Sequence, residues 1–251
     1  MKVISLATLV LLLFTAVGMK QANPLENDYP EALQKVFDAH GGIDAWKSYG
    51  ALTFGIEKEN GVEMNYVNLW DRRDRIDGQN FTMGYDGKQV WLKAGEDYKG
   101  NAVFYHNLMF YFYAMPFVLG DDGINYSETE PMEFEGKSYP GVKISYNQGV
   151  GSSDLDEYIL YYDPETYQMA WLGYTATYYT KKRKKEFSKI RYDNWTKVGD
   201  IVLPQSISWY KVEDGQVTEA RNTVKFTDLK LTKERHPDST FEMPEGAKVA
   251  E

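Results

Sequence analysis

Apolar and polar residues alternate along most of the chain from residue 51 onward. Leu52, Phe54 and Ile56 alternate with polar or small residues up to Asn60-Gly61, a strong hairpin signal, and the alternation continues beyond that turn. The same period of two returns over residues 142–146 and 158–162, and the apolar run 90–92 indicates a short buried strand. Further strands between turn signals are expected over 169–179, 186–195, 201–212 and 217–231. Because successive strand residues face opposite sides, this pattern predicts a meander of antiparallel strands in one continuous curved sheet.

Two segments carry apolar residues three and four positions apart, which is typical of helices. In residues 30–47, Gly41-Gly42 interrupts the pattern, so we predict a helix that ends near His40 and a short second turn over Asp44–Lys47. The helical spacing over residues 101–117, which Pro116 stops, predicts one helix that packs its rings into the concavity of the sheet. The expected fold class is therefore mainly β (α+β), an antiparallel curved sheet or half-barrel with helices packed on the concave side.

The first 22 residues have the pattern of an export signal. Met1-Lys2 is a short positive start, Val3–Val17 is mostly apolar, and small residues near Gly18 suit a signal peptidase. The apolar run is shorter than the roughly 20 residues of a bilayer span, which disfavours the alternative of a transmembrane anchor. We expect a signal peptide over 1–22, a single half-barrel domain over 23–251, and export to the periplasm as a soluble protein.

Composition narrows the functional classes. The chain has no cysteine, which excludes disulfides, thiolate metal sites, a cysteine nucleophile and a lipoprotein anchor. Its formal net charge of −9 argues against nucleic-acid binding, which needs a basic surface. The 20 tyrosines, 12 phenylalanines and 6 tryptophans supply more ring area than a plain core requires, so some could line a cavity.

The sequence has no recognisable catalytic or metal-binding motif. His40 is expected to cap a helix end, where a cation favours the helix dipole. His106 lies among aromatic residues and is expected to pack or to border a cavity, and His236 precedes a proline in a predicted loop. The glycines of 149–153 lie between strands, unlike a phosphate loop, and the acidic residues after them lack the spacing of an EF-hand. We therefore expect no metal, no cofactor and no catalytic residues.

Five consecutive basic residues, Lys181–Lys185, form the one strong charge block. Such a block can be a solvated bend whose charges discourage edge pairing. It can also dock on anionic head groups or an acidic partner, which would suit a carrier that meets a membrane. Both interpretations remain open from the sequence.

Several long segments resemble an uncharacterised exported family that is associated with Bacteroidetes-type bacteria and with the LolA/LppX-like fold. They are PEALQKVFDAHGGIDAWKSYGALTF (30–54), YDGKQVWL (85–92), MPFVLGDDGINY (115–126), GVKISYNQGVGSSDLDEYILYYDPETYQMAWLGY (141–174) and VLPQSISWY (202–210). The resemblance implies a half-barrel plugged by helices, whose cavity carries lipid or lipoprotein acyl chains in better-understood relatives. Many members have a lipoprotein cysteine, which this chain lacks.

The leading functional expectation is a non-enzymatic periplasmic carrier or binder of a hydrophobic ligand, either a lipid or a lipoprotein acyl chain. Transient contact with a membrane surface or an envelope protein would accompany it. Two alternatives are a structural or interaction protein with a self-plugged cavity, and a hydrolase or lyase with an unrecognised site. From ring size and placement in apolar segments, the expected lining residues are Trp70, Trp91, Phe112, Phe117 and Trp171.

Overall fold

The computed structural model describes residues 29–149, 153 and 155–251. The predicted signal peptide over 1–22 and most of the glycine-containing loop at 149–153 therefore lie outside the described residues, as does Asp154. Within the described part of the chain, no helix has both the length and the apolar character needed to cross a membrane.

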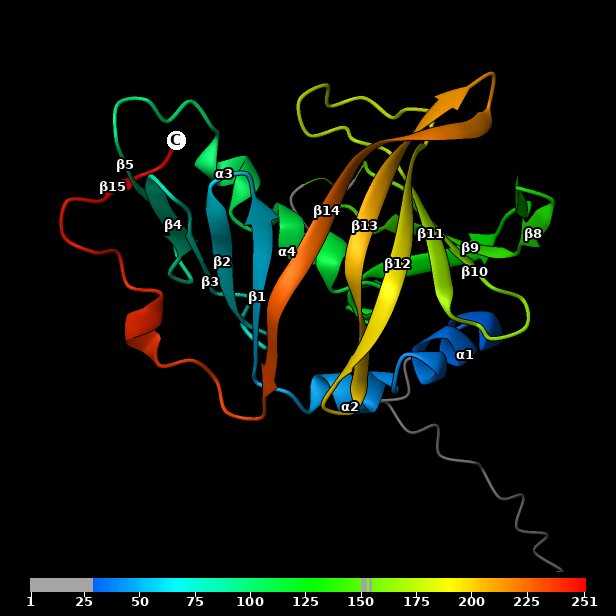
Figure 1. The fold of residues 1–251 in the computed structure, drawn as a ribbon, viewed down its shortest axis with the longest axis horizontal. Coiled ribbons are helices and arrows are strands. Elements are labelled where there is room, and N and C mark those ends of the chain that lie inside the picture. Colours follow the sequence, from blue (N-terminus) through cyan, green and yellow to red (C-terminus); the bar gives the residue numbers. More distant parts are fainter. Residues whose placement is uncertain (1–28, 150–152, 154) are drawn as a thin grey trace, which may run out of the picture.

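Most described strands belong to one antiparallel sheet, as the alternation predicts (Figure 1). Its thirteen strands are β1 (Ala51–Lys58), β2 (Gly61–Asn68), β3 (Asp74–Asp77), β4 (Phe81–Tyr85), β5 (Val90–Ala94), β6 (Ile124–Glu128), β9 (Gly141–Tyr146), β10 (Tyr158–Tyr162), β11 (Met169–Tyr174), β12 (Ser188–Val198), β13 (Ile201–Glu213), β14 (Gln216–Thr232) and β15 (Lys248–Val249). A separate hairpin consists of β7 (Met132–Phe134) and β8 (Lys137–Tyr139).

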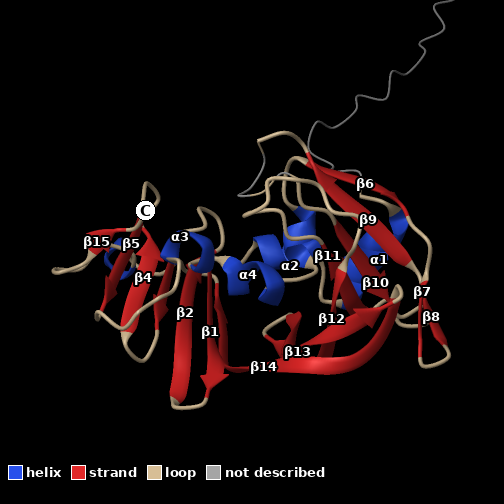
Figure 2. Cartoon of the chain, turned by 90° about the horizontal axis from the view of Figure 1, so that it is seen from above, coloured by secondary structure: helices blue, strands red, loops and turns tan. Residues whose placement is uncertain are grey.

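The sheet is continuous because its first strand pairs with one of its last. The order is β15-β5-β4-β3-β2-β1-β14-β13-β12-β11-β10-β9-β6, so β14 joins the β1–β5 side to the β9–β13 side. Ala51 of β1 lies opposite Thr232 of β14. Figure 2 shows the two sides curving around the helices, and the outermost strands β15 and β6 lie at opposite ends. The expected open, curved antiparallel sheet is confirmed.

Helices occupy the concave side of this sheet (Figure 2). They are α1 (Glu31–Ala39), α2 (Ile43–Lys47), α3 (Ala102–Tyr105), α4 (Leu108–Tyr113) and the 3-10 helix η1 (Phe117–Gly120), and a further 3-10 helix, η2 (Asp238–Thr240), follows β14. The predicted end of the first helix near His40 is confirmed, since His40 is its C-cap.

Two predicted elements differ from the structure. The single helix over 101–117 is wrong, because the turn residues His106 and Asn107 separate α3 from α4. The predicted strand over 169–179 ends at Tyr174. Beyond it, Thr175 and Thr177 bond instead to the segment before β10: the Thr175 N–H donates to Glu157 O (3.0 Å) and the Thr177 N–H to an Asp156 carboxylate oxygen (2.7 Å).

Aromatic stacking fixes the helices on the sheet. Phe117 stacks on Trp46 of α2, with ring centroids 4.7 Å apart. Tyr113 of α4 packs between Phe54 of β1 (4.5 Å) and Phe226 of β14 (4.3 Å), at the junction of the two sides of the sheet. These rings belong to the main buried cluster, which includes residues of α1, α2, α4 and both sides of the sheet. The concave face is therefore largely a packed core.

His40 ties α1 to two strands. Its Nδ1 lies 3.2 Å from Val202 O, and its Nε2 accepts the Met169 N–H at 3.0 Å. Because Nε2 accepts, Nδ1 carries the proton and donates. Burial lowers the pKa of His40 to about 4, so the ring is neutral at pH 7. The predicted position at a helix end is correct, but the expected cationic interaction with the helix dipole is wrong.

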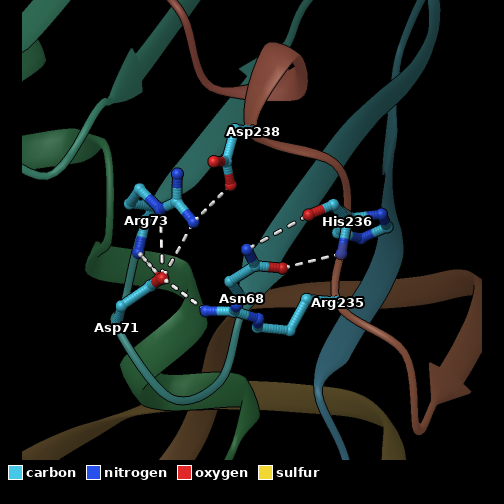
Figure 3. Close-up of polar contacts among 6 residues, drawn as sticks. All are labelled: Asn68, Asp71, Arg73, Arg235, His236 and Asp238. Atoms are coloured by element: carbon cyan, nitrogen blue, oxygen red, sulfur yellow. Dashed lines mark hydrogen bonds and ion pairs between the residues drawn. The ribbon is translucent and has the colours of Figure 1, made fainter.

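The C-terminal segment is fastened to the β2–β3 turn by a polar cluster (Figure 3). The Asn68 side chain accepts the His236 N–H (2.9 Å) and donates to His236 O (3.4 Å). Arg73 bridges Asp71 and Asp238, with N–O distances of 2.9 Å to each. This arrangement leads the chain after β14 along the outside of the β1–β5 side, where β15 pairs with β5.

Candidate functional site

An apolar cavity lies where α3 and α4 face the ends of β9 and β10. Its volume is about 320 Å³. The residues that line it come from α3, α4, η1, the two strands and six connecting segments: Arg72, Val103, Phe104, Asn107, Leu108, Tyr111, Phe112, Met115, Val118, Asp121, Asp122, Tyr146, Ser153, Asp156, Tyr158 and Tyr178. Most of these side chains are apolar or aromatic, so the cavity suits an apolar ligand.

The sequence of α4 explains why a cavity remains beside a packed core. All six residues of Leu108–Tyr113 are apolar or aromatic, so the helix has no polar face to present to water. Tyr113 faces the sheet, whereas Leu108, Tyr111 and Phe112 contribute to the cavity. The backbone oxygen of Phe112 accepts the buried Tyr192 hydroxyl at 2.7 Å, which holds this helix on β12.

Among the apolar and aromatic residues that line the cavity, the tyrosines supply most of the polar atoms. Tyr146 of β9 and Tyr158 of β10 meet edge to face with centroids 5.9 Å apart. Burial raises the pKa of both phenols well above the usual value, so both remain protonated. Neither hydroxyl has a hydrogen-bond partner among the residues that the structure describes. They can therefore donate to a polar end of a bound molecule.

One end of the cavity is charged. The Arg72 Nη2 atom lies 2.7 Å from each carboxylate oxygen of Asp121. Its Nη1 atom is buried and, within the described residues, without a hydrogen-bond partner. Burial raises the pKa of Asp121, although Arg72 opposes that shift. Asp122 and Asp156 also line the cavity, so its charged lining is acidic overall.

A buried histidine–carboxylate pair lies just behind this end. The His106 Nδ1 atom is 2.7 Å from Asp74 Oδ2, and Asp74 Oδ1 has no partner in the described chain. Burial raises the pKa of Asp74 to about 6. A carboxylate that orients a histidine supplies two of the three members of a hydrolase triad. However, no hydroxyl of the described residues is hydrogen-bonded to His106, so the pair lacks an activated nucleophile here.

The five residues expected to line a cavity lie in five different environments. Phe112 lines the cavity described above. Phe117 is fully buried against Trp46. Trp171 is buried on the outer face beneath the β7–β8 hairpin, and Trp91 is buried with its indole N–H donating to Phe241 O at 2.9 Å. Trp70 is 60% exposed, and its indole N–H donates to Lys47 O at 3.3 Å.

Several lining residues carry no signal that could be recognised in the sequence. Tyr146 and Tyr158 lie on predicted strands, but alternation does not reveal which face of a strand is concave. Arg72 lies in a turn with φ of 59°, where no functional motif is recognisable. Tyr178 follows β11 and brings the basic block Lys181–Lys185 near the cavity, with Lys181 Nζ 4.6 Å from the Tyr178 ring centroid.

The described residues contain no group of three histidine or carboxylate side chains that could hold a metal ion.

The fold and the cavity define an open curved-sheet β protein with helices and an apolar cavity on its concave side. The sequence model of a family of unknown function, DUF6503, matches residues 84–220, more than half of the chain. The chain belongs to this family. No curated protein matches the sequence.

Some solved structures are similar to this chain. A LolA superfamily protein from Nitrosomonas europaea has 10% identity and a TM-score of 0.47, over 84% of this chain and 96% of that chain. A DUF1329 family protein from Desulfovibrio piger has 11% identity and a TM-score of 0.47, over 85% and 98%. The lipoprotein LppX from Mycobacterium tuberculosis has 12% identity and a TM-score of 0.25, over 58% and 88%. All three are remote likenesses.

Proposed function

We propose that this protein binds a hydrophobic ligand, a single acyl chain or an apolar molecule of similar size, in the cavity between α4 and the β9–β10 ends. The observation that supports this proposal is the cavity, which stays open beside a core that is otherwise packed. Binding requires no chemical conversion of the ligand. The export pattern of residues 1–22 supports a periplasmic setting for this binding.

The cavity's size limits the ligand. A volume of about 320 Å³ lies at the lower end of the range of roughly 300–1,000 Å³ for ligand sites. It therefore suits one chain rather than the several chains of a triacylated lipoprotein. Burial contributes roughly 0.8 kcal/mol per methylene, so ten methylenes would supply about 8 kcal/mol before the cost of immobilising the ligand.

The polar end favours a ligand with an uncharged or cationic head over an anionic one. Asp122 and Asp156 in the lining repel an anion, and the positive charge of Arg72 is largely neutralised by Asp121. The Tyr146 and Tyr158 hydroxyls can donate to a carbonyl or hydroxyl oxygen. An ester, an alcohol or an amide head group meets these conditions best.

The alternative of a self-plugged cavity has support of its own. The rings of α2, α4 and η1 fill much of the concave face, as the Phe117 and Tyr113 contacts show. In that case the remaining space would be a packing defect, and no ligand would bind in it. The two functions differ in what happens when the space is filled by a side chain.

A cavity-filling substitution separates them. Leu108 is partly buried and lines the cavity, so Leu108→Trp should fill it and weaken binding of a fluorescent long-chain alcohol at least tenfold. Leu92→Trp is the matched control, because Leu92 is also partly buried but packs in a different cluster, with Ile76 and Met83. Equal binding by Leu108→Trp and wild type, or no binding by the wild type, would reject the proposal.

A further inference from the structure

A second cavity lies on the outer face of the sheet, beneath the β7–β8 hairpin. Its volume is about 640 Å³. It is separated from the first cavity by the sheet itself. Its lining comes from the hairpin, its flanking segment, the β13–β14 turn and two strands: Thr129, Glu130, Pro131, Met132, Glu133, Phe134, Glu135, Gly136, Tyr161, Lys189, Gly215, Gln216, Val217 and Thr218.

Lys189 of β12 is a buried amine in this lining. Only 8% of the residue is exposed. Its Nζ donates to the Tyr161 hydroxyl at 3.2 Å and lies 4.6 Å and 5.7 Å from the centroids of Tyr161 and Phe187. Among the described residues, no carboxylate lies within ion-pair distance of this Nζ. The ammonium ion is therefore buried without a counterion.

A buried ammonium ion without a counterion is costly, because burial removes its hydration. Ring faces and one hydroxyl compensate only in part. Burial lowers the pKa of Lys189 to about 8, so the amine is still mostly charged at pH 7. A bound anion would supply the missing counterion and restore the amine's preference for its charged form.

The surroundings of Lys189 select the kind of anion. Burial raises the pKa of Tyr161, so its hydroxyl keeps its proton and can donate it to an anion while accepting from Nζ. Tyr210 of the neighbouring strand β13 lies opposite Lys189 in the register, and Arg191 lies two residues along β12 on the same face as Lys189. The remaining charged groups of the lining are carboxylates of the hairpin segment: Glu130, Glu133 and Glu135.

Those carboxylates disfavour a dianion such as phosphate, because they add repulsion at the entrance. Met132, Phe134 and Val217 offer apolar contact to the rest of a ligand. We propose that this second cavity binds a monocarboxylate with an apolar body, its carboxylate held by Lys189 Nζ and the Tyr161 hydroxyl. This site is independent of the first cavity and differs from it in ligand chemistry.

Calorimetric titration with octanoate, and with neutral octanamide as its isostere, tests the site. Lys189→Met keeps an apolar stem and removes the charge, so octanoate should bind at least tenfold more weakly while octanamide binding changes little. Lys225→Met, at an exposed position on β14, is the matched control and should bind octanoate like the wild type. Equal octanoate binding by Lys189→Met and wild type, or no binding by the wild type at millimolar octanoate, would overturn the proposal.

The pH dependence gives a second readout. Octanoate affinity of the wild type should fall as the pH rises from 7 to 9, because the free amine loses its proton around pH 8. Lys189→Arg should keep its affinity over this range, since arginine stays charged. An identical pH profile for both proteins would count against the site. Leu108→Trp, which fills the first cavity, should leave octanoate binding unchanged, so the two proposals can fail separately.

Discussion

Buried polar side chains join segments of this protein that are far apart in the chain. Asn68 pairs with both backbone groups of His236, and His40 bonds to β11 and β13. Both side chains are fully buried. Groups of this kind are expensive to remove, because the partners that stay behind lose their hydrogen bonds in a place that water does not reach.

Asn68→Ala should lower the free energy of unfolding by about 1–3 kcal/mol, since it leaves the His236 N–H and C=O without partners. Chemical denaturation with an unchanged m-value would measure this. Asn125→Ala is the control, because Asn125 is exposed and, among the described residues, its side chain bonds only to the Asn147 side chain. The control should stay within about 0.5 kcal/mol of wild type. Equal effects of the two substitutions would contradict the fastening role of Asn68.

His40 should make the stability of the protein fall in mild acid. Its pKa is about 4 in the fold against 6.5 ordinarily, so the folded state binds this proton more weakly than the unfolded state. The resulting stability is complete above pH 6.5 and is lost as the pH falls toward 4, by up to about 3 kcal/mol.

His40→Gln removes this titration. The stability advantage of wild type over His40→Gln should therefore be largest above pH 6.5 and shrink toward pH 4. Titration of Asp74, whose pKa is about 6 in the fold, changes the stability in the opposite direction over the same pH range. Asp74 is present in both proteins, so its effect cancels in the difference. Denaturation midpoints measured at several pH values provide the comparison. A constant difference between pH 7 and pH 4 would show that His40 is not buried in its neutral form.

Among the elements, those set by local signals could be predicted from the sequence. Asn60-Gly61 and Asp214-Gly215 form the β1–β2 and β13–β14 turns, where positive φ angles are needed and where these residues adopt them readily (Gly61 138°, Asp214 50°, Gly215 80°). The end of α1 before two glycines follows the same logic. Such signals act over a few residues and need no knowledge of the fold.

Features that depend on distant contacts could not be predicted in this way. Alternation shows that Leu172 and Trp171 face opposite sides, but not that Leu172 is concave and Trp171 outer. Both faces of β10 and β11 are buried, because the β7–β8 hairpin covers the outer one. Trp171 lies away from the cavity for this reason, since ring size alone does not indicate a face.

The loop after β11 combines charge with an exposed ring, which suits contact with a membrane. Tyr179 is 69% exposed, and the basic block Lys181–Lys185 follows it next to Tyr178 of the cavity lining. Each basic side chain near an anionic surface contributes about 1 kcal/mol. Within that block, Arg183 approaches a carboxylate, that of Glu157 at 3.7 Å.

Replacing Lys181, Lys182, Lys184 and Lys185 by glutamine should therefore weaken binding to vesicles that contain phosphatidylglycerol at least tenfold. Binding by the wild type should also weaken as salt is added, because salt screens exposed charges. The matched control replaces Lys197, Lys211, Lys225 and Lys230, all exposed and outside the loop, by glutamine. Vesicle sedimentation measures both. Equal losses in the two variants would mean that only net charge matters, and no loss would remove the loop from membrane contact.

For the molecule as a whole, the pairing of β1 with β14 decides whether the two sides of the sheet can act separately. The main buried cluster includes Phe54 and Val67 from one side and Leu160 and Ile190 from the other. Tyr113 of α4 contacts both β1 and β14 at the junction. Backbone pairing and side-chain packing thus both connect the two sides of the sheet at the β1–β14 junction. Neither side buries its concave face without the other.

We therefore expect residues 29–251 to unfold as one cooperative unit. Trp91 reports on the β1–β5 side and Trp171 on the β9–β13 side, and both are fully buried. In the variants Trp91→Phe and Trp171→Phe, denaturation curves from tryptophan fluorescence and far-ultraviolet circular dichroism should coincide within each protein. Each substitution should shift the midpoint of both curves together. If the fluorescence of one variant instead followed an earlier or later transition than its circular dichroism, one side of the sheet would be unfolding independently, and the chain would contain two units.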